Sequence, residues 1–378
     1  MTTIALTLFV PEEGLRVWSN GGTQNVFALL ACFKSAGFDV LLVNGGPGKP
    51  PADASMPEAF RGITYHRPED VVERCDLLIE AGAQVSAEHV ARVRARGGKA
   101  VTLKFGNALV IDAERAIHDK PAGAIFNGAV FDEVWTTAQH IDTCGPYWEA
   151  LYRCPVRVLP HVWVPDFVDE AGKALPHGGR YQQGRAKKRV MILEPNINLV
   201  KTCHVPMIIA DLAYRKRPDL IAEIIVTNAT HLRDRLAFST FAKALDSVHA
   251  LAADGHHVMS FEARYSTPYY LSKRADVVVS HQWIAVPNYS HYDALHLGYP
   301  IVHNVRKMPG YHYEGFDVAE GSRALLQALE QHDYVHDRHT LYLDAAAHFL
   351  AGVDARGANN VADHAFAVEA LRAGKGAS

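Results

Sequence analysis

The sequence lacks several features that mark particular classes of protein. Its five cysteines are an odd number without a CxxC pair, which argues against a disulfide framework and predicts reduced thiols in a cytoplasmic protein. The 21 histidines include no HExxH or similar ligand spacing, so we expect no metal site. A formal net charge of −3 gives no overall attraction to nucleic acid or to anionic lipid.

Long hydrophobic runs are also missing. The apolar stretch at residues 2–10 has no basic segment before it and is too short for a signal peptide or a membrane span, so we interpret it as a first strand. Hydrophobic residues make up 48% of the chain and charged residues 21%, a composition typical of soluble globular proteins. A length of 378 residues fits two domains, each with its own core.

Short apolar segments alternate with helical ones along most of the chain. This alternation predicts an α/β fold with parallel sheets that helices cover on both faces. The composition changes at residues 166–188, which are rich in glycine and positive charge and are interpreted as an interdomain linker. We therefore expect two Rossmann-like domains facing across a cleft, with residues 1–165, the linker 166–188, residues 189–350, and a C-terminal helix and tail at 351–378.

The densest group of polar side chains lies between Ser280 and Asn304. A buried strand ends at Ser280, a helix begins at about Tyr289, and Gly298 and Pro300 separate this helix from the next strand. A helix N-terminus after a parallel strand offers free N–H groups to a diphosphate. An ordinary βαβ connection has the same pattern, but few structural loops need so many polar groups. These are His281, Gln282, Trp283, Asn288, Tyr289, Ser290, His291 and Asp293.

This stretch is interpreted as the donor half-site of a nucleotide-sugar enzyme. Asp293 is expected to bind the ribose, and Lys201 to pair with a phosphate. Arg264 and Tyr265 follow a strand end, where they would flank the base or simply pack at the rim. For His281, a core histidine bonded to the backbone is the alternative. The predicted donor site comprises Asn196, Lys201, Arg264, Tyr265, His281, Gln282, Tyr289, Ser290 and Asp293.

In the first half of the chain, Gly21 and Gly22 precede a helix predicted at 26–36. They would form a glycine loop that lets the backbone approach a ligand, although a plain turn explains them equally. Glu80 ends a buried strand and either caps the next helix or acts in chemistry. We predict Glu80 first and His140 second as the base that deprotonates an acceptor.

The sequence resembles an uncharacterised bacterial family, a domain of unknown function placed in the GT-B glycosyltransferase superfamily. The segments that carry the resemblance span nearly the whole chain in order. They are Gln24-Asn-Val, Glu80-Ala-Gly-Ala, Arg153-Cys-Pro-Val, Pro160-His-Val-Trp, Glu194-Pro-Asn-Ile-Asn-Leu-Val-Lys-Thr, Phe261-Glu-Ala-Arg-Tyr, Val279-Ser-His-Gln-Trp, Asp293-Ala-Leu-His-Leu-Gly-Tyr-Pro-Ile-Val-His-Asn and Gly315-Phe-Asp.

The resemblance implies a glycosyltransferase that binds its nucleotide-sugar donor without a metal ion and needs no further cofactor. Many retaining GT-B enzymes carry two glutamates eight positions apart in the segment that corresponds to 280–304. Here Asp293 stands for the second glutamate, and the first falls on Ala285. An enzyme that retains configuration needs no protein base, so the roles of Glu80 and His140 depend on inversion.

Several alternatives stay open at this point. The acceptor is a glycan, a lipid-linked sugar, a protein or a modified DNA, and the near-neutral charge makes DNA the less favoured partner. A GT-B fold also serves nucleotide-sugar 2-epimerases, which need no acceptor. A non-catalytic binding protein on the same fold is the remaining possibility. Neither the donor nucleotide nor the oligomeric state follows from the sequence.

Overall fold

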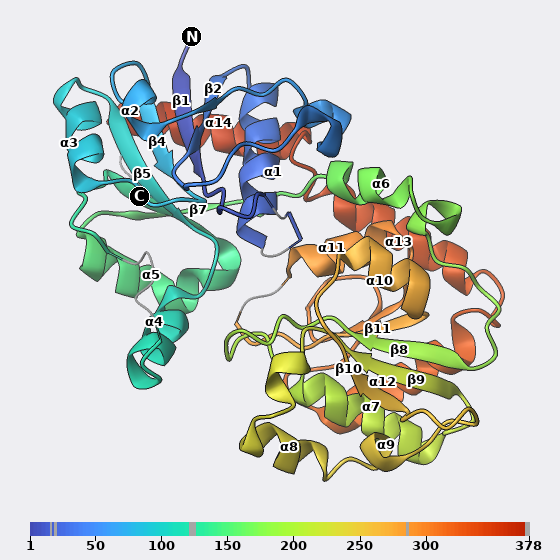
Figure 1. Ribbon diagram of the computed structural model, residues 1–378. Helices are drawn as coiled ribbons and strands as arrows, with labels where there is room; N and C mark the ends of the chain where they lie inside the picture. The colour runs from blue at the N-terminus through green and yellow to red at the C-terminus, as the bar shows by residue number, and fades with distance from the viewer. Residues whose placement is uncertain (16, 19–20, 121–125, 285–286, 375–378) are drawn as a thin grey trace. The chain divides into compact units, whose positions relative to one another are not determined.

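The computed structural model describes residues 1–15, 17–18, 21–120, 126–284 and 287–374 (Figure 1). The chain divides into two compact units, one made of Met1–Phe167 with Ala351–Ser378 and the other of Val168–Leu350. Each unit is built around its own parallel sheet. The C-terminal segment from Ala351 therefore belongs to the first unit, and the predicted α/β class is confirmed.

Within the described residues, seven parallel strands form the sheet of the first unit in the order β3-β2-β1-β4-β5-β6-β7. These strands are β1 (Thr3–Leu8), β2 (Asp39–Asn44), β3 (Tyr65–His66), β4 (Leu77–Glu80), β5 (Lys99–Lys104), β6 (Glu133–Thr137) and β7 (Val156–Leu159). The helices of this unit are α1 (Gly21–Ser35), α2 (Pro68–Val71), α3 (Ala87–Ala95), α4 (Ala108–Ile117), α5 (Ala138–Tyr152) and α14 (Ala358–Arg372).

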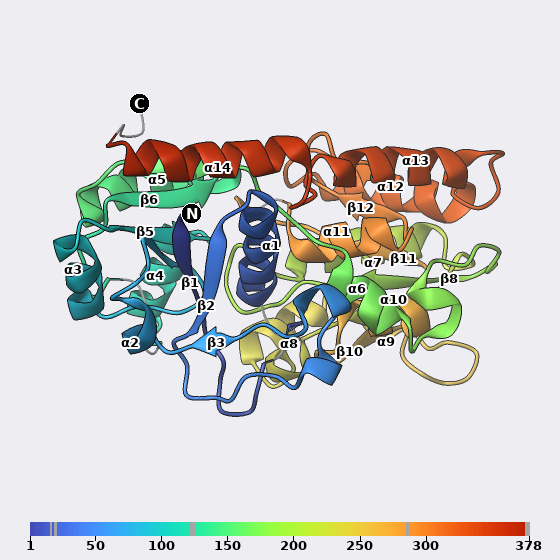
Figure 2. The ribbon, with the colours of Figure 1, turned by 90° about the horizontal axis from the view of Figure 1, so that it is seen from above.

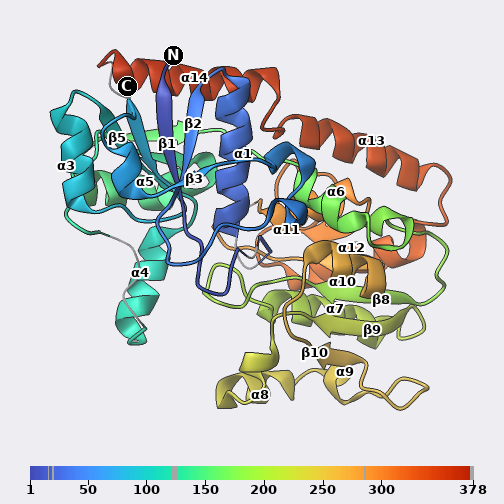
Figure 3. The same cartoon turned by 45° about the horizontal axis from the view of Figure 1, so that its top comes forward.

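The first sheet is buried on both faces because its strands alternate their side chains. Ile4, Leu6 and Leu8 of β1 join the core beneath α1 and α14, whereas Ala5 joins a second core with residues of α3 and α5. Figures 2 and 3 both show α14 (red) next to α1 (blue), although the two helices lie far apart in the sequence. The C-terminal helix thus completes one face of the N-terminal sheet.

The second unit has a six-stranded parallel sheet, counted over the described part of the chain, in the order β10-β9-β8-β11-β12-β13. Its strands are β8 (Lys188–Ile192), β9 (Ile221–Val226), β10 (Met259–Phe261), β11 (Val277–Val279), β12 (Ile301–His303) and β13 (Tyr311–His312). Its helices are α7 (His204–Lys216), α8 (Leu236–Ala242), α9 (Asp246–His249), α10 (Thr267–Arg274), α11 (Tyr289–His296), α12 (Val318–Gln331) and α13 (Arg338–Ala351).

Two helices end at a glycine with a left-handed backbone conformation, as predicted. Gly298 has φ +80°, and its N–H donates to the Leu295 carbonyl at 3.0 Å, which closes the end of α11. Gly37 has φ +81° after α1. A positive φ is strained for any residue that carries a Cβ atom, so the backbone requires glycine at both positions.

Residues 166–188 differ from the predicted linker. They contain α6 (Asp166–Gly172), and Tyr181 is buried, with its hydroxyl donating to Asp333 at 2.8 Å. The glycine-rich composition suggested a flexible connection, but the tyrosine anchors this segment to the second unit.

The predicted glycine loop is also corrected. Helix α1 begins at Gly21 rather than at Val26, so Gly21 and Gly22 form its first turn. The Asn25 side chain donates to the Gly21 carbonyl at 2.9 Å, and Thr23 and Gln24 are buried, which fixes this turn as helix. Asn20, which the loop interpretation included, lies outside the described residues.

Candidate functional site

The carboxyl ends of β8 and β11 form the centre of the second unit. These strands are neighbours, yet the chain leaves β8 toward β9 on one side, and β11 is followed by β12 on the other. Such a switch in strand order is where open α/β sheets bind ligands. Glu194 follows β8, and His281 and Gln282 follow β11; their exposed fractions are 1%, 4% and 2%.

Glu194 is the carboxylate at this point. Its Oε1 accepts a hydrogen bond from Ser280 Oγ at 2.5 Å and one from the His281 N–H at 3.1 Å. Burial raises the pKa of Glu194 from 4.5 to about 7, although the Ser280 and His281 hydrogen bonds lower it. In the sequence, Glu194 stands out only as the first residue of a segment that carries the family resemblance. Its burial, which raises the pKa, is visible only in the fold.

Several polar atoms around Glu194 are buried and lack a hydrogen-bond partner of normal geometry among the described residues. They are Glu194 Oε2, His281 Nε2 and both amide atoms of Gln282. The Gln282 amide still lies close enough to help lower the pKa of Glu194. A buried polar group without a partner is costly, so this group of atoms is a candidate ligand contact.

The side chains of Tyr313 and Asn304 hold His281 and Gln282 in place. His281 Nδ1 lies 3.0 Å from the Tyr313 hydroxyl, and burial lowers the pKa of His281 to about 4, which keeps the ring neutral. The Gln282 N–H donates to Asn304 Oδ1 at 3.1 Å, and the Gln282 carbonyl accepts from Asn304 Nδ2 at 2.9 Å. The bond to Tyr313 is with a side chain, so it differs from the core histidine bonded to the backbone that was the alternative.

The N-terminus of α11 is joined to the same group. Asn288 caps the helix by accepting from the His291 N–H at 3.2 Å, and Ser290 Oγ donates to the Asn288 side chain at 2.5 Å. His291 Nε2 lies 2.8 Å from Ser280 Oγ, which itself donates to Glu194. A chain of hydrogen bonds therefore links the helix N-terminus to the buried carboxyl group.

The other predicted donor residues of α11 are part of the core. Tyr289 is 6% exposed and Asp293 1% exposed. Burial raises the pKa of Tyr289, and Tyr292 and Asp293 raise it further. Asp293 thus lies in the helix beside Tyr289, in a packed environment.

Asn196 and Lys201 lie in the connection between β8 and α7. Asn196 has φ +54°; its amide group donates to the carbonyls of Glu194 and Thr227, both at 3.1 Å, and accepts from the Cys203 N–H at 2.8 Å. These bonds give Asn196 a positioning role in the loop. Burial lowers the pKa of half-buried Lys201, and the nearby Glu194 carboxyl raises it.

Arg264 and Tyr265 are exposed beyond the end of β10. The Tyr265 ring meets the edge of Tyr270 with centroids 5.1 Å apart and lies 5.6 Å from Tyr269. The structure therefore gives Tyr265 aromatic neighbours of its own chain, as the rim-packing alternative describes.

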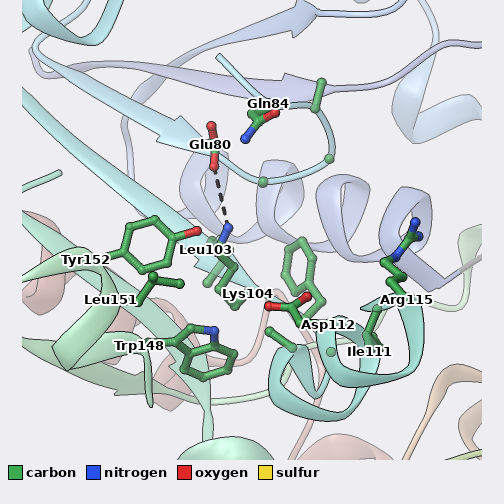
Figure 4. A pocket seen from close by; sticks show the side chains of 16 residues that line it. Glu80, Gln84, Leu103, Lys104, Ile111, Asp112, Arg115, Trp148, Leu151 and Tyr152 are labelled. Atoms are coloured by element: carbon green, nitrogen blue, oxygen red, sulfur yellow. Dashed lines mark ion pairs between the residues drawn. The ribbon is translucent and has the colours of Figure 1, made fainter. Parts of the chain in front are cut away.

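A cavity of about 240 Å³ lies in the first unit at the carboxyl ends of β4 and β5, walled by α4 and α5 (Figure 4). Glu80 ends β4 and Lys104 ends β5, and Lys104 Nζ lies 3.6 Å from Glu80 Oε1. Glu80 Oε1 also accepts from Thr102 Oγ1 at 2.9 Å, and Oε2 accepts from the Val85 N–H at 2.9 Å. Glu80 thus lines the cavity and also holds the loop that leads into α3.

Helices α4 and α5 add side chains that the sequence analysis did not single out. Asp112 Oδ2 accepts from the Tyr147 hydroxyl at 2.8 Å, and burial raises the pKa of Asp112. The Lys104 ammonium lies 5.1 Å from the Tyr152 ring centroid, and burial lowers the pKa of Lys104. Arg115 and Trp148 complete the polar part of the wall.

His140 does not line this cavity, in the part of the chain that the structure describes. It is 1% exposed, and its Nε2 lies 3.2 Å from the Phe105 carbonyl. Gly21 and Gly22 do not line it either, within the same ranges. Of the residues predicted for the first domain, only Glu80 is therefore found at the cavity.

Two features are absent from the described residues. None of the described helices combines the length and the hydropathy that a membrane crossing requires. Within those same residues, no three side chains of His, Cys, Asp or Glu are grouped so as to hold a metal ion.

Comparisons with known proteins identify a family and a fold. The family model described as "Protein of unknown function (DUF2827)" matches residues 4–367. No curated protein sequence matches the chain.

Solved structures are similar over almost the whole chain. An α-glucosyltransferase in complex with UDP and a 13-mer DNA has a TM-score of 0.60, with 9% identity over 97% of this chain and 98% of that one. A UDP-forming α,α-trehalose-phosphate synthase from Burkholderia xenovorans has a TM-score of 0.58, with 12% identity over 98% and 99%. Anabaena HepE in complex with UDP and glucose has a TM-score of 0.56, with 11% identity over 98% and 100%. These similarities show the GT-B fold.

Proposed function

Since the chain belongs to the DUF2827 family and has the GT-B fold, we propose that it transfers a sugar from a nucleotide-sugar donor to an acceptor. The observation that carries the proposal is the group of unpartnered buried polar atoms on Glu194, His281 and Gln282, counted over the described residues, at the switch point of the second sheet. Structurally similar proteins were solved with UDP, so UDP-sugars are the first donors to test.

The donor diphosphate would bind at the N-terminus of α11 and at Lys201. A helix N-terminus and an ammonium both stabilise the negative charge that develops on the leaving group. Glu194, with a pKa of about 7, holds a proton for part of the time near neutral pH and can then donate it in a hydrogen bond to a phosphate oxygen. The Tyr313 hydroxyl donates to the Ser280 carbonyl, so neutral His281 donates to Tyr313 through Nδ1 and offers Nε2 as an acceptor to a hydroxyl of the donor. The Gln282 amide offers both a donor and an acceptor.

The remaining predicted donor residues keep their proposed roles with one change. Asp293 would bind the ribose, and Arg264 and Tyr265 would lie near the base. Asn196 acts by shaping the loop that carries Lys201, because its amide bonds the main chain on both sides. Tyr289 and Ser290 would contribute through the first turn of α11.

For an inverting reaction, the acceptor proton needs a base. Glu80 is the better placed of the two predicted residues because it lines a cavity, whereas His140 is bonded to a carbonyl. Glu80→Gln should then lower kcat by about 10²-fold, since the amide cannot take up a proton. Glu69→Gln, on the exposed surface of α2, is the matched control and should leave kcat unchanged. Unchanged turnover of Glu80→Gln would remove Glu80 as the base.

Product analysis tests the proposed reaction itself. The protein is incubated with UDP-glucose and UDP-N-acetylglucosamine, each with and without a panel of glycan acceptors. Acceptor-dependent release of UDP with a new glycoside is the expected result. Conversion of the donor to its 2-epimer without an acceptor would instead identify an epimerase, and an unchanged donor under all conditions would contradict both activities.

A further inference from the structure

The cavity in the first unit has a balance of charge that restricts its ligand. Its wall carries two carboxylates, Glu80 and Asp112, and two cations, Lys104 and Arg115. Lys104 pairs with Glu80 at 3.6 Å inside the wall. A cavity with equal numbers of both signs attracts neither anions nor cations strongly, so the ligand that fits best is neutral.

Two buried atoms of this wall lack a hydrogen-bond partner among residues 1–15, 17–18, 21–120, 126–284 and 287–374. Asp112 Oδ1 is an acceptor, and Trp148 Nε1–H is a donor on a side chain that is 0% exposed. In Figure 4 the indole nitrogen is on the ring edge that faces Asp112. A ligand that satisfies both atoms must accept one hydrogen bond and donate another, as neighbouring hydroxyl groups do.

The rest of the wall is apolar and the space is small. Leu103, Phe105, Ile111, Leu151 and the Tyr152 ring surround the polar groups. A volume of about 240 Å³ lies below the range of sites for drug-sized ligands, about 300–1,000 Å³. Apolar walls with a few placed polar groups suit a compact molecule with both C–H faces and hydroxyls.

We propose that this cavity binds one neutral hexose-sized sugar, with Asp112 Oδ1 accepting from one hydroxyl and Trp148 Nε1 donating to another. Lys104 and Gln84, also on the wall, are within the same space and can bond further hydroxyls. The inference deepens the proposed function by naming the class of acceptor, and it rests on that function only for the acceptor role. Sugar binding itself depends on the first unit alone.

Saturation-transfer NMR without any nucleotide tests this inference on the full chain. The probes are glucose, galactose, mannose and N-acetylglucosamine, with glucose 6-phosphate and glucosamine as the anionic and cationic comparisons. At least one neutral sugar should bind saturably and more tightly than both charged comparisons. Asp112→Ala and Trp148→Phe should each weaken its binding by about tenfold or more.

Two controls keep the test decisive. Trp148→Phe removes an N–H that has no hydrogen-bond partner in the described residues, so the substitution breaks no hydrogen bond of the fold. The variant should lose only ring contacts and should still unfold in one cooperative transition. Gln183→Leu, on the exposed surface of the second unit, should leave sugar binding unchanged. Sugar binding that persists while no nucleotide binds would contradict the proposed transferase but support this site.

The opposite results would overturn the inference. If no neutral sugar binds, or if binding survives both substitutions, the cavity is not the site. Tighter binding of glucose 6-phosphate than of glucose would identify an anion site built on Lys104 and Arg115.

Discussion

The two units treat buried polar groups differently. At the cavity of the first unit, Lys104 and Glu80 stay close as a charge pair, and the exposed fractions of their side chains are 16% and 6%. Burial also lowers the pKa of Lys104 in the cavity, but at the switch point of the second unit it brings the pKa of Glu194 to about 7 and that of His281 to about 4, so the first is partly neutral and the second neutral near pH 7. The first arrangement suits a neutral ligand among balanced charges, and the second suits an anionic ligand that brings its own charge.

The largest expected change in stability is the loss of a buried lysine in the second unit, and the lysine of the cavity is its comparison. Lys188 pairs with Asp333, with side chains only 2% and 1% exposed. Lys188→Met should lower the free energy of unfolding by about 3–5 kcal/mol, because Asp333 loses its charge partner in an almost fully buried site, even though Tyr181 and Gly184 still donate to it. Lys104→Met should cost only about 1 kcal/mol, because Glu80 keeps its bonds from Thr102 and Val85.

Urea unfolding followed by circular dichroism measures both costs. Lys173→Met, which removes an exposed ammonium paired with Glu170, is the matched control and should change stability by less than about 0.5 kcal/mol. Equal losses for Lys188→Met and Lys104→Met would mean that the cavity does not screen its charge pair.

A pH series sharpens the comparison at Glu194. Its pKa is about 7 in the folded protein and 4.5 without burial, so the folded state binds the extra proton between these values. The penalty for ionising Glu194 is absent below about pH 4.5 and complete above about pH 7, where it amounts to about 3 kcal/mol. The contribution of Glu194 to the free energy of unfolding of the wild type should therefore fall by about 3 kcal/mol as the pH rises from 4.5 to above 7.

Glu194→Gln removes that titration. Thermal unfolding at pH 5 and pH 8 should show a stability difference between variant and wild type that grows in favour of the variant by up to about 3 kcal/mol at the higher pH. Comparing the variant with the wild type at each pH removes the effect of the neighbouring histidines, whose pKa values are lowered by burial. A difference independent of pH would contradict the raised pKa.

The smallest effect concerns the Gln282 side chain. Its amide makes no hydrogen bond of normal geometry to any described residue, and its main chain remains fixed by Asn304. Gln282→Leu should change the free energy of unfolding by no more than about 1 kcal/mol, because the amide makes no hydrogen bond of normal geometry and interacts only with the nearby Glu194 carboxyl. Gln183→Leu on the exposed surface is the control, and differential scanning calorimetry reads both. A large loss of stability would show that the amide supports the fold.

Much of the fold was predictable because its strands are continuous apolar runs. The segments at Leu77–Glu80 and Val277–Val279 are strands as expected, since parallel strands buried on both faces need no polar alternation. Helix α4 was missed, although Asn107 before it is a capping residue whose side chain accepts from the Val110 N–H at 3.2 Å. Asp112 and Arg115 were missed with that helix.

The candidate sites were predictable only in part. Dense polar residues after Ser280 pointed to the switch point of the second sheet, and Glu80 pointed to the cavity of the first. Side-chain packing decides which polar atoms lack a hydrogen-bond partner, and the spacing of residues in the sequence does not reveal this packing. Asn196 illustrates the limit, since its amide is used entirely by the main chain. Trp148 illustrates the reverse, as an apolar position on α5 whose N–H has no acceptor in the described residues.

Calorimetric titration of nucleoside diphosphates tests whether the switch point of the second unit binds the donor. UDP, GDP, CDP and dTDP are titrated into wild type and Gln282→Leu, with and without Mg²⁺. UDP should bind the wild type, and Gln282→Leu should weaken UDP binding by about tenfold or more while the variant stays folded. Failure of all four nucleotides to bind the wild type, or equal affinity in the variant, would contradict a donor site at the switch point of the second unit.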